Sequence, residues 1–267
     1  MGNRKAIWLT DLHLNFLDFT GNQRFINQIR NEKPDIILIG GDTGEAHNII
    51  SYLKELEQSL DPEIYFVLGN HDFYKGSLSQ VREEARNATN KYEKLFYLDE
   101  TPFVELSKDT ALIGHSSWAD GRLGDYKKSD VMLNDYLLIR ELSGLTKADR
   151  LKKLNQLGDE AASQLQSKLE IVVEKYNSIL CLTHVPPFRE SCWHEGRISD
   201  DDYLPHFACK AVGDVLRTTM KKNPNSYLTV LCGHTHSPGK FQTLKNLEVL
   251  TGKAKYGQPE IQKVIYL

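Results

Sequence analysis

Five short polar fragments constrain the fold of this chain most, because each follows an apolar run with the character of a β-strand. The fragments are Asp11-Leu12-His13, Gly41-Asp42, Gly69-Asn70-His71-Asp72, Thr183-His184 and Gly233-His234-Thr235-His236. The strands of a doubly wound α/β fold end along one edge of the sheet, where ligands bind. Side chains that are far apart in the sequence can therefore converge there, and we expect the five fragments to form one site.

The order of the apolar runs in the first third of the chain predicts alternating strands and helices. Apolar runs at 6–10, 36–40 and 64–68 are separated by two stretches with helical spacing. The residues expected on the buried faces of these two helices are Phe25, Ile26, Ile29, Ile49, Ile50, Leu53 and Leu56. This β-α-β-α-β order is typical of parallel strands with helices packed on the sheet.

The remaining sequence predicts a second group of elements. A helix over 78–90 is followed by three short runs, which we interpret as a strand meander, at 95–98, 103–106 and 111–114. The region from Asp125 to Lys175 is expected to be mainly helical, with a break near Gly144, as a second helical layer or a partial lid.

The last third of the chain returns to strand-like sequence. We expect strands at 178–183 and 228–232, a helix at 211–222, and a hairpin of 240–244 with 247–251 that turns at Lys245-Asn246. A final run at 261–267 could close a sheet edge. The elements together predict an α/β sandwich of two mixed sheets with helices outside, built as a single domain over residues 1–267.

Composition limits the partners of the protein. A chain of 267 residues with 40% hydrophobic and 26% charged residues is ordinary for a globular protein. Its net charge of -3 offers no broad attraction to phosphate backbones, so long nucleic acid is an unfavoured partner. We find no signal-peptide pattern, no apolar stretch of membrane-spanning length and no paired cysteine spacing. We therefore expect a cytoplasmic protein without a membrane partner; its oligomeric state stays open.

The polar fragments have the donor types of a metal site. Asp11 and His13 are one residue apart just after a strand, so both side chains can point to the same side and share one metal. His234 and His236 have the same spacing, but a loop can splay them toward two different ions. The carboxylate of Asp42 could bridge two ions about 3.5 to 4 Å apart, the usual separation in two-metal sites.

Two further residues complete this expected centre. Asn70 and His184 would fill the ligand shell of the second ion. Imidazole, carboxylate and carboxamide ligands together suit manganese, iron or zinc better than magnesium or calcium. We therefore expect two divalent or mixed-valence transition metal ions as cofactors.

The fragments match a known motif series, and the chain resembles the calcineurin-like metallophosphoesterase superfamily. The series D-x-H, G-D, G-N-H-[DE], H and G-H-x-H occurs in order between residues 11 and 236. The resemblance implies a four-layer α/β/β/α sandwich in which a metal-bridging hydroxide attacks phosphorus in line. It implies that the first metal is bound by Asp11, His13, Asp42 and His236, and the second by Asp42, Asn70, His184 and His234. It also implies that His71 contacts the substrate.

His71 and Asp72 are the candidate catalytic pair. A protonated His71 could donate its proton to the leaving oxygen or stabilise the charge there. Asp72 could hold the His71 imidazole and raise its pKa. An aspartate at this position could equally cap the following turn.

Four residues outside the motifs are candidate substrate contacts. His115 follows the apolar run 111–114, and we give equal weight to contact with substrate and to simple packing of its loop. Trp118, in the same loop, offers a possible stacking face. Arg189 and Trp193 lie in the loop that follows His184.

The leading functional hypothesis is a two-metal phosphoric ester hydrolase that acts on a small or medium phosphoester, either as a phosphodiesterase or as a phosphomonoesterase. The final G-H-x-H looks more like the phosphodiesterase and nuclease branches of the resembled family than like its Ser/Thr protein phosphatases. One alternative is a metal-containing interaction module that has lost turnover. Another is a nuclease, which the net charge and the lack of a basic, aromatic-rich segment disfavour.

Overall fold

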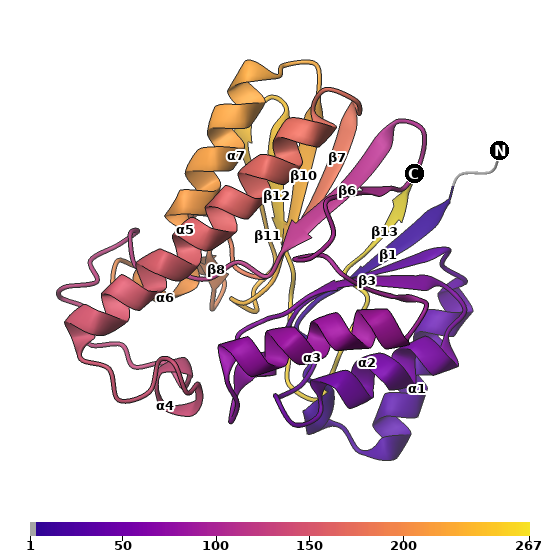
Figure 1. The fold of residues 1–267 in the computed structure, drawn as a ribbon, viewed down its shortest axis with the longest axis horizontal. Helices are drawn as coiled ribbons and strands as arrows, with labels where there is room; N and C mark the ends of the chain where they lie inside the picture. Colours follow the sequence, from indigo (N-terminus) through magenta and orange to yellow (C-terminus); the bar gives the residue numbers. More distant parts are fainter. Residues whose placement is uncertain (1–3) are drawn as a thin grey trace.

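The computed structural model describes residues 4–267, which form two stacked sheets with helices on both outer faces (Figure 1). The first sheet has the strand order β13-β1-β2-β3-β4, and the second has the order β11-β12-β10-β7-β6-β5. Both sheets are mixed, so the predicted four-layer α/β/β/α sandwich is confirmed. Within residues 4–267, no helix has the length and apolar character needed to cross a membrane.

The first sheet contains the predicted β-α-β-α-β unit. Its strands are β1 (Lys5–Leu9), β2 (Ile36–Gly40), β3 (Glu63–Val67), β4 (Leu95–Tyr97) and β13 (Lys263–Tyr266). Strands β1 to β4 run parallel, and β13 pairs antiparallel with β1 at the edge, as expected for the final apolar run. The outer face is covered by α1 (Phe19–Glu32), α2 (Ile49–Ser59) and α3 (Leu78–Lys91).

The second sheet has a parallel centre and antiparallel edges. Its strands are β5 (Val104–Glu105), β6 (Thr110–His115), β7 (Ser178–Thr183), β10 (Tyr227–Cys232), β11 (Gly239–Leu244) and β12 (Leu247–Thr251). The helices α5 (Lys147–Val172) and α7 (Lys210–Lys222) lie on its outer face. Strands β11 and β12 form the predicted hairpin, with a register shift between Gln242 and Leu244.

The predicted meander at 95–114 is wrong. β4 pairs parallel with β3 in the first sheet, whereas β5 and β6 form an antiparallel pair in the second sheet. The chain therefore crosses from one sheet to the other between β4 and β5. Three short apolar runs in succession cannot show which sheet each of them joins, because that choice depends on tertiary packing.

The region after β6 carries the irregular segments. Residues 116–134 contain no regular helix or strand, and α4 (Asp135–Leu138) is short. The chain then breaks at Gly144, whose φ of 71° suits glycine, before α5 begins. Backbone hydrogen bonds from Lys75 to Leu138 and from Arg140 to Gly76 tie this segment to the loop after β3. Other short elements are α6 (Leu204–Phe207), β8 (Trp193–His194) and β9 (Arg197–Ile198), with 3₁₀ helices at Leu14–Phe16, His71–Phe73 and Arg189–Ser191.

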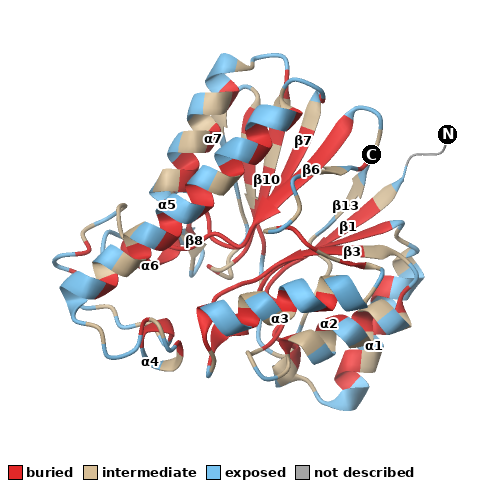
Figure 2. Ribbon diagram, viewed as in Figure 1, coloured by how far each residue is buried: buried red, intermediate tan, exposed pale blue. Residues whose placement is uncertain are grey.

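Alternating side chains of the strands build three apolar layers, and the central strands β1, β2, β3, β6 and β7 are buried along almost their whole length (Figure 2). Between the sheets, Trp8 and Leu38 pack with Leu182 and Leu231 of the opposite sheet. The other faces of the strands pack against the helices in two separate clusters. This alternation fixes the register of each strand, and so fixes where the residues after its carboxyl end lie.

Candidate metal centre

The five polar fragments follow β1, β2, β3, β7 and β10, and the structure brings them together where the carboxyl ends of both sheets meet. Five of their residues have left-handed backbones that non-glycine residues rarely adopt: Asp11, His13, Asp42, His234 and His236, with φ between 44° and 71°. Each such residue costs roughly 1–2 kcal/mol. Strain of this kind clusters at functional sites, where the surrounding structure enforces it.

One group of donors consists of Asp11, His13, Asp42 and His236, whose ligand atoms all lie within 4.8 Å of one another. The Nε2 atoms of His13 and His236 are 3.2 Å apart. His236 Nε2 also lies 3.4 Å from Asp11 Oδ1, and His13 Nε2 lies 3.8 Å from Asp42 Oδ2. Two carboxylates and two ring nitrogens thus face a common point.

A second group of donors surrounds the Asn70 carboxamide oxygen. His184 Nε2 lies 3.0 Å from Asn70 Oδ1, and His234 Nδ1 lies 2.8 Å from the same oxygen. The other nitrogen of each ring faces a backbone carbonyl oxygen, that of Gly40 for His184 and that of His206 for His234. Those carbonyls require an N–H, so the nitrogens that face Asn70 carry lone pairs.

Asp42 connects the two groups. Its Oδ1 lies 3.5 Å from His184 Nε2, while its Oδ2 faces His13. The same Oδ1 accepts a hydrogen bond from the backbone N–H of His71 at 2.8 Å, which fixes the carboxylate. Asp42 therefore presents one oxygen to each group of donors.

The electrostatics of the centre suit a cation. Burial, followed by the neighbouring Asp11 carboxylate, raises the pKa of Asp42 well above its usual range. Burial lowers the pKa of His13 to about 2 and that of His234 to about 3, so both rings are neutral at pH 7. Two buried carboxylates with neutral imidazoles and a carboxamide oxygen form an acceptor-rich set, and these residues fit divalent metal ions.

Asp135 and Tyr74 orient Asn70, and the sequence did not indicate either role. Asn70 Nδ2 donates to Asp135 Oδ1 at 2.9 Å, and the Tyr74 hydroxyl donates to the same oxygen at 2.7 Å. The carboxamide oxygen of Asn70 is thereby turned toward His184 and His234. Asp135 lies on α4, outside every strand-end fragment, so no local pattern marks it.

The structure places Asp72 differently from the sequence expectation that it holds the His71 imidazole. Its two carboxylate oxygens accept backbone N–H groups of Gly44 and Gly69, each at 2.8 Å. Burial raises the pKa of Asp72 to about 7, although these hydrogen bonds oppose the increase. Asp72 thus fixes the loops after β2 and β3. Sequence spacing cannot distinguish this contact from one to the neighbouring ring.

His71 lies at the edge of the donor groups and lines a cavity. Its ring centroid is 4.7 Å from that of His13, and its ring stacks on Tyr74 at 4.2 Å. The cavity has a volume of about 300 Å³ and contains both donor and aromatic side chains. Its lining is Asn70, His71, Tyr74, Leu133, Asn134, Asp135, His194, Phe207, His234, Thr235, His236 and Tyr256.

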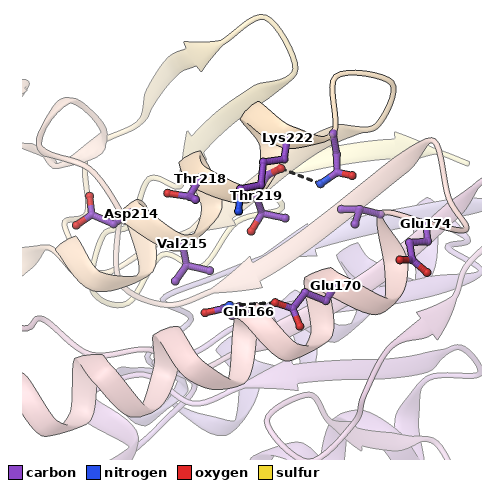
Figure 3. Close-up of a pocket in the computed structure, with 10 residues that line it drawn as sticks. Gln166, Glu170, Glu174, Asp214, Val215, Thr218, Thr219 and Lys222 are labelled. Atoms are coloured by element: carbon purple, nitrogen blue, oxygen red, sulfur yellow. Dashed lines mark hydrogen bonds between the residues drawn. The ribbon is translucent and has the colours of Figure 1, made fainter.

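A larger cavity of about 440 Å³ lies elsewhere, between α5 and α7 (Figure 3). Its lining includes the carboxylates Glu170, Glu174 and Asp214, with Thr218 and Thr219. Its lining, as described within residues 4–267, contains no histidine or cysteine. We therefore assign the chemistry to the cavity beside the metal donors.

The lining described for the cavity beside the metal donors does not include the four predicted substrate contacts His115, Trp118, Arg189 and Trp193. His115 is buried with its Nε2 3.6 Å from Asp99 Oδ2, and Trp118 is buried against Phe73. Arg189 forms an ion pair of 2.7 Å with Asp201. Trp193 packs over Gly239.

The residues that do line the cavity include several from outside the five polar fragments. Tyr256 lies in the segment between β12 and β13, with its ring 4.6 Å from His13 and 5.3 Å from His236. His194 and Phe207 form an aromatic contact of 5.1 Å on the side of His234. Tyr256 and Phe207 follow no strand-end motif, so only the tertiary structure brings them to the site. His194 lies in the loop that follows His184, beside the predicted contacts Arg189 and Trp193.

Carboxylate, imidazole and carboxamide donors at the carboxyl edge of an α/β/β/α sandwich define a metal-dependent hydrolase. The sequence agrees with this class. Residues 5–238 match the family described as calcineurin-like phosphoesterase, and the chain belongs to that family. It is therefore a metal-dependent phosphoester hydrolase, as the resemblance of its motifs predicted.

Solved structures share the fold at low sequence identity. The phosphopantetheinyl hydrolase of Mycobacterium tuberculosis is similar with a TM-score of 0.62 and 13% identity, covering 96% of this chain and 91% of that one. A dimetal phosphatase from Danio rerio is similar with a TM-score of 0.61 and 13% identity, covering 100% and 93%. No curated protein matches the sequence. At such identities the likeness extends to the fold alone.

Proposed function

We propose that this protein is a two-metal phosphoesterase that hydrolyses a small or medium phosphoester. The position of Asp42 carries this proposal, because its two carboxylate oxygens face separate donor groups. Asp11, His13 and His236 would hold one ion with Asp42, and Asn70, His184 and His234 would hold the other. The similar fold of a structure described as a dimetal phosphatase is consistent with this count.

The donor set favours manganese, iron or zinc ions, in agreement with the mixed nitrogen and oxygen ligands. Such ions neutralise charge on phosphoryl oxygens and lower the pKa of bound water from about 15.7 toward 7.

The protein itself supplies positioning and an acid. Asp135 holds Asn70 in place, and the backbone N–H of His71 fixes Asp42. The His71 imidazole lies beside the donors and faces the cavity, where it can donate a proton to the leaving oxygen. Burial lowers the pKa of His71 to about 3 when the donors carry only their own charges. An anionic phosphoester next to the ring favours the protonated form that this role requires.

The cavity supports a substrate of limited size. A volume of about 300 Å³ is enough for a phosphoryl group with a small organic group attached. Tyr256 and Phe207 offer apolar ring faces for that group, while Asn134 and His194 add polar atoms.

Assays of the metal-loaded protein with model esters test the proposal. The protein is stripped with chelator and reloaded separately with manganese, iron(II) or zinc, and the bound metal per chain is measured. Bis(p-nitrophenyl) phosphate and p-nitrophenyl phosphate then report diesterase and monoesterase turnover. We expect two ions per chain and hydrolysis of at least one ester.

Each alternative gives a different result. Retention of two ions with no hydrolysis of either ester by any metal form would identify an interaction module. One ion per chain at saturation would overturn the two-metal centre. Faster cleavage of a short oligonucleotide than of both esters would identify a nuclease.

A further inference from the structure

A second, smaller cavity lies beside the metal centre and is lined by cationic side chains. Its volume is about 120 Å³, and its lining is Tyr126, Asp130, Val131, Met132, Lys147, Arg150 and His206. None of these residues belongs to the strand-end fragments. The backbone carbonyl of His206 accepts the Nε2–H of the metal-site residue His234 at 3.1 Å, so His206 stands between the two sites.

Arg150 is a buried cation without a carboxylate partner. The residue is only 8% exposed, and its side chain has no ion pair with any acidic group in residues 4–267. The guanidinium stacks on Tyr136 at 4.3 Å, and Nη1 contacts the Met132 sulfur. Its Nε is buried and has no hydrogen-bond partner. Burial of an uncompensated charge is costly, so a counter-ion at this point would remove a large penalty.

Lys147 adds a second positive charge at the same cavity. It is the first residue of α5, a helix whose N-terminal end carries partial positive charge and free backbone N–H groups. Its ammonium donates to the backbone carbonyls of Lys127 and Ser129, and within the described chain it also lacks an acidic partner. The two cations outnumber the one carboxylate in the lining, that of the exposed Asp130.

Two hydroxyl groups outside the lining fix the His206 side of the cavity. The Tyr136 hydroxyl and the Ser129 hydroxyl bind the two ring nitrogens of His206, which holds this ring in place at the wall of the cavity. Within residues 4–267, neither Lys147 nor Arg150 forms an ion pair with the exposed Asp130. The cavity thus combines positive charge with fixed walls.

We propose that this cavity is a binding site for a small tetrahedral oxyanion, such as phosphate or sulfate, distinct from the metal centre. The volume exceeds the space of a single water, which occupies about 30 Å³ in the liquid. Arg150 offers a planar set of N–H donors, and Lys147 offers an ammonium with one N–H beyond the two that bind backbone carbonyls. Arginine and lysine are the side chains that proteins use most for phosphate. The proposal rests on this cavity alone and does not depend on the metal count or substrate proposed above.

Calorimetric titration of sulfate into the metal-loaded protein tests the site. Lys147→Met removes an exposed cation, so the variant is expected to fold, and Arg150→Met removes the buried one. The matched control is Lys152→Met, which lies on the same helix and pairs with Asp149 at 3.3 Å. We expect Lys147→Met to weaken sulfate binding by roughly tenfold and Arg150→Met by more, with no change in Lys152→Met.

Unchanged sulfate affinity in Lys147→Met would overturn the proposal, as would equal weakening in Lys152→Met. Binding of sulfate at the metal centre would persist in all three variants, so it cannot imitate the expected result. Competition with phosphate and with methyl phosphate then identifies the source of the anion. Displacement of sulfate by phosphate alone indicates a free inorganic ion, and displacement by both indicates that a small phosphate ester also enters.

Discussion

Asn70 donates a hydrogen bond of 2.9 Å from its Nδ2 to Asp135, a residue 65 positions later in the chain. This bond decides which end of the carboxamide faces the metal donors, because an amide that gives its N–H₂ to a carboxylate must present its oxygen in the other direction. A residue of the short helix α4 therefore orients a candidate ligand that follows β3. Outer partners of this kind tune metal affinity.

Replacement of Asp135 by alanine is expected to weaken metal binding. Without its partner, the Asn70 carboxamide can rotate and present N–H₂ to the ions, and loss of such a partner typically costs roughly 10–100-fold in affinity. Metal titration at equilibrium measures this effect. Asp214→Ala, at an exposed ion pair on α7, is the control. Equal metal affinity in Asp135→Ala and wild-type protein would show that Asn70 is held by other contacts.

Replacement of His71 by alanine is expected to leave metal binding intact and to reduce turnover. The His71 side chain faces the cavity, while its backbone N–H, which fixes Asp42, is retained in the variant. Loss of a general acid lowers kcat by roughly 10²–10⁴-fold. Metal content and kcat are measured on the same preparation. An unchanged kcat would remove His71 from the mechanism.

Replacement of Asp72 by asparagine is expected to destabilise the fold. Asp72 is fully buried, and both of its oxygens accept backbone N–H groups, so an asparagine would place an N–H₂ against one of them. Leaving a buried donor without an acceptor costs about 1–3 kcal/mol. Urea unfolding measures the loss, with the exposed Asp61→Asn as control. Loss of turnover at unchanged stability would instead support a direct role beside His71.

The Tyr256 ring is expected to contribute to substrate binding. Tyr256→Ala removes a ring that lies over His13 and His236 and lines the cavity. Aromatic contacts contribute about 0.5–1.5 kcal/mol, so KM for p-nitrophenyl esters should increase by roughly two- to tenfold. Steady-state kinetics of Tyr256→Ala and Tyr256→Phe check this, because the second variant keeps the ring. An increase in KM of equal size in both variants would point to the hydroxyl.

Acidification is expected to destabilise the protein partly through His115. Burial lowers the pKa of His115 in the folded state, although Asp99 opposes the decrease. The ordinary pKa of histidine is 6.5. As the pH decreases below this value, the unfolded chain takes up a proton on His115 that the folded protein does not, so the free energy of unfolding decreases as the pH decreases. Urea unfolding between pH 8 and 5 should show a shallower decrease in His115→Gln than in wild-type protein. The exposed His47→Gln is the control, and identical slopes in all three proteins would contradict the prediction.

The sequence predicted most of the sandwich because its central strands are nearly fully buried and its helices are amphipathic. It also predicted which polar residues gather, since each follows a strand whose direction in the sheet is fixed. Asp135 and Tyr256 escaped prediction because Asp135 begins the four-residue helix α4 and Tyr256 lies in an irregular segment. Neither stretch has a periodicity that relates a residue to a position in space. Asp72 shows a different limit. Its partners are backbone N–H groups, which every residue except proline carries, so the sequence cannot show that Asp72 binds them and not the neighbouring His71 ring. The crossing between β4 and β5 was not predicted, because tertiary packing decides which sheet each of these short strands joins.

The group of Asp11, His13, Asp42 and His236 takes three of its residues from the first sheet and one from the second. An ion held there is attached to both halves of the sandwich, in the manner of a covalent cross-link between them. Sliding or separation of the two sheets would have to break metal–ligand bonds, and ligands that bind only the folded state raise its stability by mass action. An ion bound at this group would therefore also stabilise the packing of the two sheets, and its removal by a chelator should lower the free energy of unfolding.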